Sequence, residues 1–171
     1  TVIAVLSDHG HLLGENKFMG KPPSGLYPGL MDLVYFIKSP GQQPKEIDRF
    51  VYNHDLFPTL FYLLGEDIPP QAEGKNLWEL VEGKTESIRD YVTSALKTWL
   101  WARDDNYAMI RRSNGEEVRL YNIKNDPDCR ENIAPDEADI VNRMYEMMSV
   151  QYPPYHISSS HITSHRHHVL V

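Results

Sequence analysis

The residues best suited to chemistry stand near the beginning of the sequence, in Ser7-Asp8-His9-Gly10. Asp8 offers a hard carboxylate oxygen of the kind that divalent cations prefer. His9 offers a ring nitrogen to a metal, or a hydrogen bond to an anion held there. Lys21 follows after a loop and could return to place an ammonium beside them. A divalent metal and a lysine together would neutralise the oxygens of a sulfate or phosphate, which stabilises a transition state electrostatically.

These residue types alone leave a plainer interpretation open. An Asp-His pair after a strand is more often a capped turn, and a single lysine is more often a solvated surface residue. His11 and Glu15, which flank the motif, could support a site from outside, but we favour exposed loop positions for both. Whether this segment binds a metal or an anion therefore depends on the strands and loops that position its side chains.

The segment that precedes the motif is a continuous apolar and β-branched run, TVIAVL, at residues 1–6. Such runs are typical of a parallel strand covered on both faces in an α/β sheet. Because ligands gather at the carboxyl ends of strands in these sheets, a metal site at Asp8 and His9 is geometrically reasonable. A chain that opens inside a core strand is expected to be part of something larger. Residues 11–31, rich in Gly and Pro, predict a long irregular loop of functional importance.

The rest of the sequence predicts two further regions and a tail. A strand at 33–38, a helix at about 55–64 and a short helix at 76–81 complete an α/β part over residues 1–84. Leu56, Leu60, Leu63 and Leu64 share one face of the longer helix. Four short runs, at 91–96, 98–103, 107–112 and 117–123, predict a small antiparallel sheet, and an amphipathic helix follows at 136–150. The sheet and this helix form a second region over residues 85–152. A flexible His- and Ser-rich tail is expected over 153–171.

Composition excludes several classes of function. The chain of 171 residues carries a net charge of -7, which argues against nucleic acid as a main partner because phosphate binding needs a basic face. No apolar run approaches the roughly 18 residues of a membrane helix, so no membrane partner is expected. Cys129 is the only cysteine, so neither an intrachain disulfide nor a Cys-based zinc cluster can form. A lone cysteine fits a reducing compartment and a piece of a secreted protein equally well.

An ordered series of motifs over residues 1–135 resembles the sulfatase family of the alkaline phosphatase superfamily. The first part comprises Ser7-Asp8-His9-Gly10, Leu13-Gly14-Glu15 and Gly20-Lys21, in the order and spacing of the family. Later parts are Tyr27, Phe36-Ile37-Lys38-Ser39-Pro40-Gly41, Asn53-His54-Asp55-Leu56-Phe57-Pro58-Thr59-Leu60, Glu73-Gly74-Lys75-Asn76-Leu77, Leu120-Tyr121-Asn122-Ile123-Lys124-Asn125-Asp126-Pro127 and Glu131-Asn132-Ile133-Ala134. The resemblance implies an α/β fold: the C-terminal part of an alkaline-phosphatase-like sheet, then a small antiparallel sheet packed with a C-terminal helix.

The resemblance also implies roles for single residues. Asp8 and His9 fall on the family's divalent-metal positions, which usually hold calcium; manganese, magnesium and zinc are the alternatives. Lys21 falls on the lysine that contacts the sulfate and serves catalysis, and His9 is also expected to contact the substrate. The shared mechanism is attack of a formylglycine hydrate on sulfur. The implied substrate is a sulfated small molecule or sugar.

The sequence departs from the family pattern at three places. The nucleophile motif Cys/Ser-x-Pro/Ala-x-Arg is absent, and Cys129 lies in the family's ending, so we expect the formylglycine in a part not contained here and no esterase activity from this chain alone. Asn16 stands where the family often has His. Pro28-Gly29-Leu30-Met31-Asp32-Leu33 replaces an acidic run, so this loop is expected to set a different substrate or to pack differently.

Alternatives to a sulfuric ester hydrolase remain open at this point. A phosphodiesterase or phosphonate monoester hydrolase of the same superfamily would use the same Asp-His pair, and a folded remnant that binds nothing is a third candidate. The aromatic residues Tyr91, Trp99, Trp101, Tyr107 and Tyr121 could form a sugar-stacking platform, but packing within the sheet is favoured. An incomplete sheet exposes an edge and apolar faces, which predicts self-association or an N-terminal part supplied as another chain.

Overall fold

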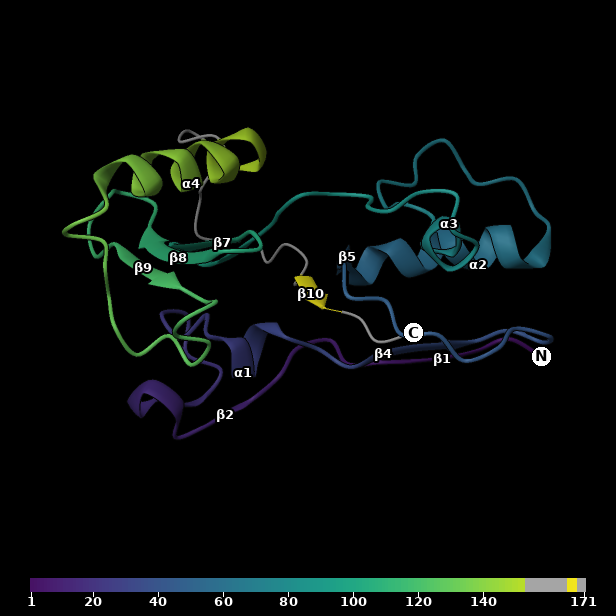
Figure 1. Ribbon diagram of the computed structural model, residues 1–171, viewed down its shortest axis with the longest axis horizontal. Coiled ribbons are helices and arrows are strands. Elements are labelled where there is room, and N and C mark those ends of the chain that lie inside the picture. Colours follow the sequence, from purple (N-terminus) through teal and green to yellow (C-terminus); the bar gives the residue numbers. More distant parts are fainter. Residues whose placement is uncertain (153–165, 169–171) are drawn as a thin grey trace. The chain divides into compact units, whose positions relative to one another are not determined.

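The computed structural model describes residues 1–152 and the backbone of 166–168, and it divides into two compact units (Figure 1). Of the described residues, unit 1 contains 1–9, 32–90 and 166–168, and unit 2 contains 10–31 and 91–152. The flexible tail expected over 153–171 lies outside the described residues, except for 166–168. Across the described part of the chain, no helix is long and apolar enough to span a membrane.

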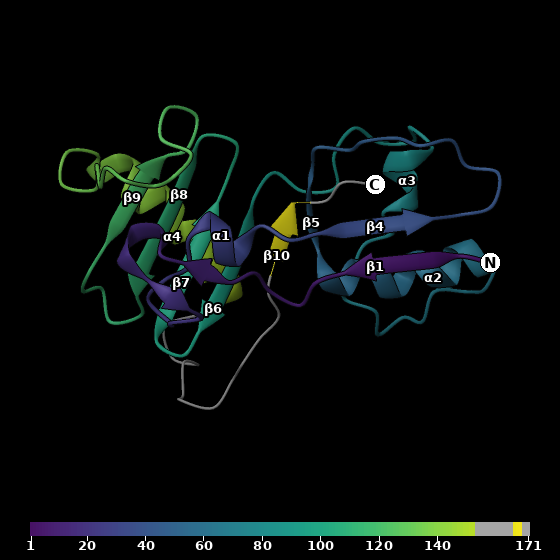
Figure 2. The same ribbon diagram turned by 90° about the horizontal axis from the view of Figure 1, so that it is seen from below.

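Unit 1 is built on two short antiparallel pairs of strands and two helices. Strand β1 (Ile3–Leu6) pairs with β4 (Tyr35–Lys38), with Val5 opposite Phe36 (Figure 2). Strand β5 (Phe50–Tyr52) pairs with β10 (Arg166–His168). The 3₁₀ turn η2 (Asn53–Asp55) leads into α2 (Leu56–Leu64), and α3 (Trp78–Val81) follows. The predicted strands at 1–6 and 33–38 and both predicted helices are therefore confirmed.

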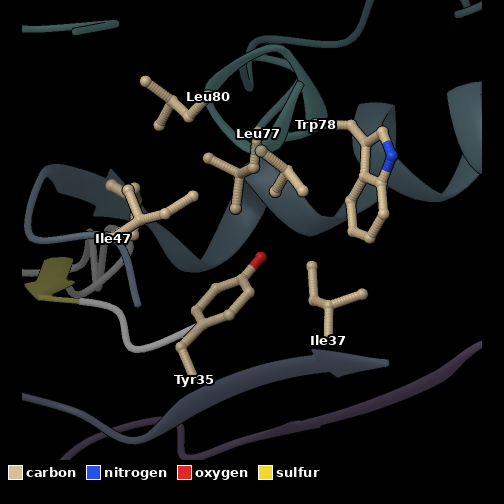
Figure 3. Packing of buried hydrophobic residues seen from close by; sticks show 8 residues of the cluster. Tyr35, Ile37, Ile47, Leu77, Trp78 and Leu80 are labelled. Carbon is tan, nitrogen blue, oxygen red and sulfur yellow. The ribbon is translucent and has the colours of Figure 1, made fainter. Parts of the chain in front are cut away.

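The expectation of a parallel strand covered on both faces is wrong for β1. Its partner among the described strands is antiparallel, and its residues alternate between exposed and partly buried. Tyr35 and Ile37 of β4 point into a core with Ile47, Leu77, Trp78 and Leu80 (Figure 3). On the opposite face, Ile3, Val5, Val34 and Phe36 each keep 49 to 55% of their surface exposed. Because nearly every residue of this run is apolar, its sequence pattern does not indicate which face of the strand is buried.

Asp55 is the structural centre of unit 1. Its side chain is fully buried, and both carboxylate oxygens bond the Arg89 guanidinium, at 2.5 and 2.9 Å. The same carboxylate accepts hydrogen bonds from the backbone nitrogens of Tyr52 at 2.6 Å and Lys75 at 2.8 Å. A buried carboxylate with four such bonds is satisfied rather than reactive. This residue therefore fixes strand β5, the segment before α3 and the end of the unit to one another.

A second set of contacts joins the start of α2 to residues 74–77. The Thr59 hydroxyl donates to the Asp55 carbonyl at 2.6 Å and accepts from the Leu77 nitrogen at 2.8 Å. A Cβ on Gly74 would lie 2.3 Å from the His54 carbonyl oxygen, so only glycine fits there. These contacts bury Thr59, while Leu64 is 68% exposed. The predicted leucine face of this helix is therefore wrong in part.

Unit 2 is a four-stranded antiparallel sheet with a helix packed on it (Figure 1). The strands are β6 (Val92–Leu96), β7 (Trp99–Arg103), β8 (Tyr107–Arg112) and β9 (Arg119–Asn122), in that order. Helix α4 (Ala138–Gln151) buries Met144 and Met148 against Leu100, Met109 and Leu120. This sheet and its helix confirm the predictions for 91–123 and 136–150.

The other face of this sheet is covered as well. Trp99, Trp101 and Tyr121 are almost fully buried, which confirms packing rather than an open stacking platform for these three. Tyr27 contacts this face: its hydroxyl lies 3.2 Å from the Tyr121 hydroxyl and accepts a hydrogen bond from Arg119 at 2.9 Å. Residues 10–31 are less irregular than expected, because they form β2 (Leu12–Leu13), η1 (Glu15–Lys17), β3 (Met19–Gly20) and α1 (Pro28–Met31).

Candidate functional site

Asp8 and His9 lie side by side just after β1 in unit 1. One oxygen of the Asp8 carboxylate accepts a hydrogen bond from the His9 backbone nitrogen at 2.9 Å, and the other lies 3.5 Å from His9 Nε2. The Asp8 side chain is 85% exposed, whereas that of His9 is 27% exposed. A carboxylate and an imidazole that are both exposed in part can be reached by a cation from solvent. This pair is therefore accessible to a ligand.

Asn53 holds the backbone of this pair in place. Its side-chain nitrogen donates to the carbonyls of Ser7 at 3.2 Å and Asp8 at 3.4 Å, which ties the end of β1 to the turn after β5. The remaining amide oxygen of Asn53 is buried, and no atom of the described residues donates to it. The sequence analysis placed Asn53 only within the motif series that resembles the sulfatase family. A contact across 45 positions of the chain leaves no signal in a single sequence.

The ring of His54, next along the chain, packs on Tyr52 with 4.8 Å between ring centroids. Burial lowers the pKa of His54, and the nearby Asp55 carboxylate only partly opposes this effect. His54 is therefore predominantly neutral at neutral pH. It supports the turn rather than adding a positive charge to it.

Lys21 belongs to unit 2, where it follows the hairpin of β2 and β3. Leu12 pairs with Gly20, so Lys21 lies at the open end of the hairpin, near residues 10 and 11. Gly10 passes very close to the next segment: its nitrogen donates to the Leu30 carbonyl at 2.9 Å, and a Cβ there would lie 2.2 Å from the Gly29 carbonyl oxygen. The glycine after the Asp-His pair is thus required by close packing of the backbone.

The structure brings two of the three predicted site residues together. Asp8 and His9 adjoin within unit 1, whereas Lys21 lies in unit 2, and its convergence with them stays a prediction. Within residues 1–152, no three His, Cys, Asp or Glu side chains group closely enough to hold a metal ion. The Asp8 carboxylate and the His9 imidazole are both donor types that divalent cations use in proteins. They would supply only part of the coordination of such a cation.

Comparisons with known proteins agree with the motif series. Residues 1–66 match the family model for sulfatases. The chain is 25% identical over 158 residues to the uncharacterized sulfatase YidJ of Escherichia coli K12, covering 86% of this chain and 31% of that protein. It therefore spans about a third of the length of this relative.

Solved structures share the fold. A structure described as being in complex with its substrate, D-glucosamine-2-N,6-O-disulfate, matches with a TM-score of 0.71 and 20% identity, over 94% of this chain and 36% of that one. The phosphonate monoester hydrolase of Silicibacter pomeroyi matches with a TM-score of 0.74 and 20% identity, over 93% of this chain and 35% of that one. The predicted α/β class is confirmed by these neighbours. The chain is therefore similar to sulfatases in the matched segment 1–66 and shares their fold, as the motif series predicts.

Proposed function

We propose that this chain is the part of a sulfuric ester hydrolase that contributes Asp8, His9 and Lys21 to a divalent-metal and sulfate site. The observation that carries the proposal is the adjacent Asp8 and His9 at the end of β1, inside the segment that matches the sulfatase family. Lys21 lies inside the same matched segment.

The three residues have separate tasks in this proposal. The Asp8 carboxylate and the His9 ring would hold the metal, which the resemblance to sulfatases suggests is calcium; manganese, magnesium and zinc are the alternatives. When bound, the metal would offset the negative charge of the sulfate oxygens. The Lys21 ammonium would bond a sulfate oxygen and stabilise the charge that develops there. His9 can also donate a hydrogen bond to the bound anion.

The substrate we propose is a sulfated small molecule or sugar. A structural neighbour has D-glucosamine-2-N,6-O-disulfate as its substrate, which supports a sulfated sugar without identifying one for this chain. With a net charge of -7, the whole chain repels anions, so the metal and Lys21 would have to attract the sulfate locally.

The chain by itself is expected to be inactive. The sequence contains no Cys/Ser-x-Pro/Ala-x-Arg motif, so it cannot supply the formylglycine that attacks sulfur. Incubating the purified 171-residue chain with an aryl sulfate and calcium should release no phenol above background. Turnover that disappears in Asp8→Ala would overturn this expectation.

The metal half of the proposal can be tested on the chain as it stands. Mn²⁺ is paramagnetic, so weak binding in the millimolar range broadens nearby amide resonances. We expect selective broadening at Ser7, Asp8 and His9 that calcium reverses by competition and that Asp8→Ala abolishes. Asp67→Ala, at an exposed position of the same unit, is the matched control and should leave the broadening unchanged. Uniform or absent broadening would favour the third candidate, a folded remnant that binds nothing.

A phosphonate monoester hydrolase remains the second candidate function. The observation in its favour is the phosphonate monoester hydrolase fold, which matches this chain with a TM-score of 0.74. Competition separates the two candidates: sulfate should perturb the Lys21 resonances more strongly than phenylphosphonate if the sulfatase proposal holds. The reverse order would favour the phosphonate enzyme.

A further inference from the structure

The turn between β8 and β9 in unit 2 contains a reactive pair of residues that the proposed function does not use (Figure 2). Of the nine asparagines in the sequence, Asn114 alone is followed by a glycine. Asn114 and Gly115 are both exposed, and so are Glu116 and Glu117 after them. An Asn-Gly pair favours a hairpin turn, but it also places a side-chain amide beside a backbone nitrogen with no bulky neighbour.

The fold itself requires the glycine of this pair. Gly115 has a φ of 89°, and a Cβ there would lie 3.1 Å from a guanidinium nitrogen of Arg111. A side chain at this position would therefore be strained. Because the glycine has none, the approach from its nitrogen to Cγ of Asn114 is not obstructed. The residue that the turn requires is thus also the one that leaves the neighbouring amide open to attack.

Three hydrogen bonds hold the pair in the turn. The side-chain oxygen of Asn114 accepts from the Glu116 backbone nitrogen at 3.1 Å, and its side-chain nitrogen donates to the Glu116 carboxylate at 3.0 Å. The Gly115 nitrogen donates to the Arg112 carbonyl at 3.0 Å. Since these bonds lie at an exposed tip, each contributes little and a local opening releases the Gly115 nitrogen without unfolding the sheet.

We infer that Asn114 and Gly115 form a self-modification site, at which the folded chain converts its own asparagine to aspartate and isoaspartate. The Gly115 nitrogen loses its proton and forms a bond to Cγ of Asn114. The Cγ–Nδ2 bond breaks, and Nδ2 takes up a proton from solvent and leaves as ammonia. The product is a succinimide ring. The Glu116 N–H, already bonded to the side-chain oxygen, stabilises the negative charge that develops there during attack.

Water then opens the ring at one of two bonds. Cleavage between the Gly115 nitrogen and Cγ restores the normal backbone and gives aspartate at position 114. Cleavage between this nitrogen and the backbone carbonyl carbon routes the chain through Cβ and Cγ and gives isoaspartate. Isoaspartate is therefore diagnostic of the ring, because direct hydrolysis of the side-chain amide gives aspartate only.

The charges around the turn oppose the reaction in part. The attacking nitrogen becomes negatively charged, and a nearby carboxylate disfavours that charge. Glu117 is paired with Arg112 at 3.0 Å, whereas the Glu116 carboxylate lies against the Asn114 amide itself. Glu116 thus has two opposite effects: its N–H assists the attack, and its carboxylate slows it.

Isoaspartate would lengthen the backbone of the turn by one atom. The register of β8 and β9 on this side begins with Ile110 opposite Arg119. Arg119 in turn donates to the Ser24 carbonyl at 3.0 Å and to the Tyr27 hydroxyl at 2.9 Å. Conversion is therefore expected to loosen this end of the hairpin first, and with it the contact of Arg119 with Tyr27.

The test uses the purified full chain, incubated folded at mildly alkaline pH and then digested with trypsin. Residues 113–119 and 125–130 are released as separate peptides, because each segment follows a Lys or Arg and ends in Arg. We expect isoaspartate to accumulate in 113–119 and not in 125–130, where the exposed Asn125 precedes aspartate. Mildly acidic pH should slow the conversion, since the attacking nitrogen must lose its proton. No conversion in 113–119, or aspartate without isoaspartate, overturns the inference.

Three variants sharpen this result. Asn114→Gln should form no isoaspartate, because its longer side chain does not close the same ring. Glu116→Gln removes the opposing charge and should raise the rate by roughly two- to fivefold. Asp105→Ala, at an exposed position beyond the opposite end of β8, is the matched control and should leave the rate unchanged. An unchanged or lower rate in Glu116→Gln would overturn the opposing role of this carboxylate.

Met144→Ala separates reaction in the folded chain from reaction in unfolded molecules. Met144 lies in the core under α4, so this variant raises the unfolded population without touching the turn. If local opening suffices, the rate at Asn114 should stay within about twofold of that of the unaltered chain. A rate that rises in proportion to the unfolded population would place the reaction in unfolded molecules and overturn the site.

Discussion

The two units differ in how the faces of their β-sheets are covered. In unit 2, strand β6 is buried along its whole length, α4 packs on one face of the sheet, and Tyr27 contacts the other face at β9. In unit 1, β1 and β4 cover a core on one side only and leave Ile3, Val5, Val34 and Phe36 half exposed on the other. Both faces of the sheet in unit 2 are therefore covered, whereas unit 1 presents an apolar face whose exposure to water is unfavourable.

The units also differ in what holds them together. Unit 2 depends on apolar side chains such as Met144 and Met109, neither of which has any exposed surface. Unit 1 adds the buried pair of Asp55 and Arg89 to its apolar core. Apolar cores lose stability in proportion to the volume removed, whereas a buried ion pair fails sharply when one partner is lost. Substitutions in each unit should reveal this difference.

The largest effect is expected for Asp55→Ala. It leaves the Arg89 charge buried and removes the acceptor for the backbone nitrogens of Tyr52 and Lys75. The free energy of unfolding of unit 1 should fall by about 3–5 kcal/mol. Hydrogen exchange measured residue by residue should show lost protection in α2 and β5 and native protection in β7 and β8. Equal loss in both units would mean that they unfold together, and Asp67→Ala is the control.

Met144→Ala is the corresponding change in unit 2. Removing this fully buried side chain should cost about 2–5 kcal/mol, depending on how far the core relaxes into the space. Exchange protection should fall in β7 and β8 while α2 stays protected. Met19→Ala, at a 72% exposed position of the same unit, should change stability by no more than about 0.5 kcal/mol. A comparable loss in α2 would contradict the independence of the units.

The exposed face of unit 1 predicts self-association, or binding of another polypeptide segment to this face. Val5 and Phe36 form a cross-strand pair on this face. Replacing both with lysine should weaken self-association at least about tenfold, because burying each apolar side chain contributes on the order of 1 kcal/mol. Sedimentation velocity measures the change. The control replaces Leu13 and Met19, a cross-strand pair of unit 2 that is more exposed, with lysine. A monomeric wild-type chain at high concentration would exclude self-association.

The fold was predictable from the sequence where apolar pattern and turn residues agree. The four strands of unit 2 have aromatic and branched residues between Asp-Asn and Asn-Gly turns, and α2 ends at Gly65 with a positive φ of 74°. Strand β5, only three residues long, has no pattern of its own and was not predicted. The covered face of β1 and the buried side of α2 depend on partners distant in sequence, Ile47 and Leu77 among them.

The candidate site was predictable only in its local part. Adjacent positions guarantee that Asp8 and His9 are neighbours, so a motif suffices to find them. Asn53 reaches the same backbone from 45 positions away, and Asn16 reaches Asp128 from 112. Such contacts follow from the packing of whole elements, which a single sequence does not encode in any short pattern.

The smallest effect concerns pH and again separates the units. Burial lowers the pKa of His54 in the folded state, so the unfolded state binds protons more readily as pH falls below about 6.5. Unit 1 should therefore keep its full stability above that pH and lose a part of it as pH falls toward the lower, folded-state pKa. His54→Gln should flatten this slope in denaturant titrations of unit 1, whereas His11→Gln, at an exposed position of unit 2, should not. An unchanged slope in His54→Gln would assign the acid sensitivity to other groups of the unit.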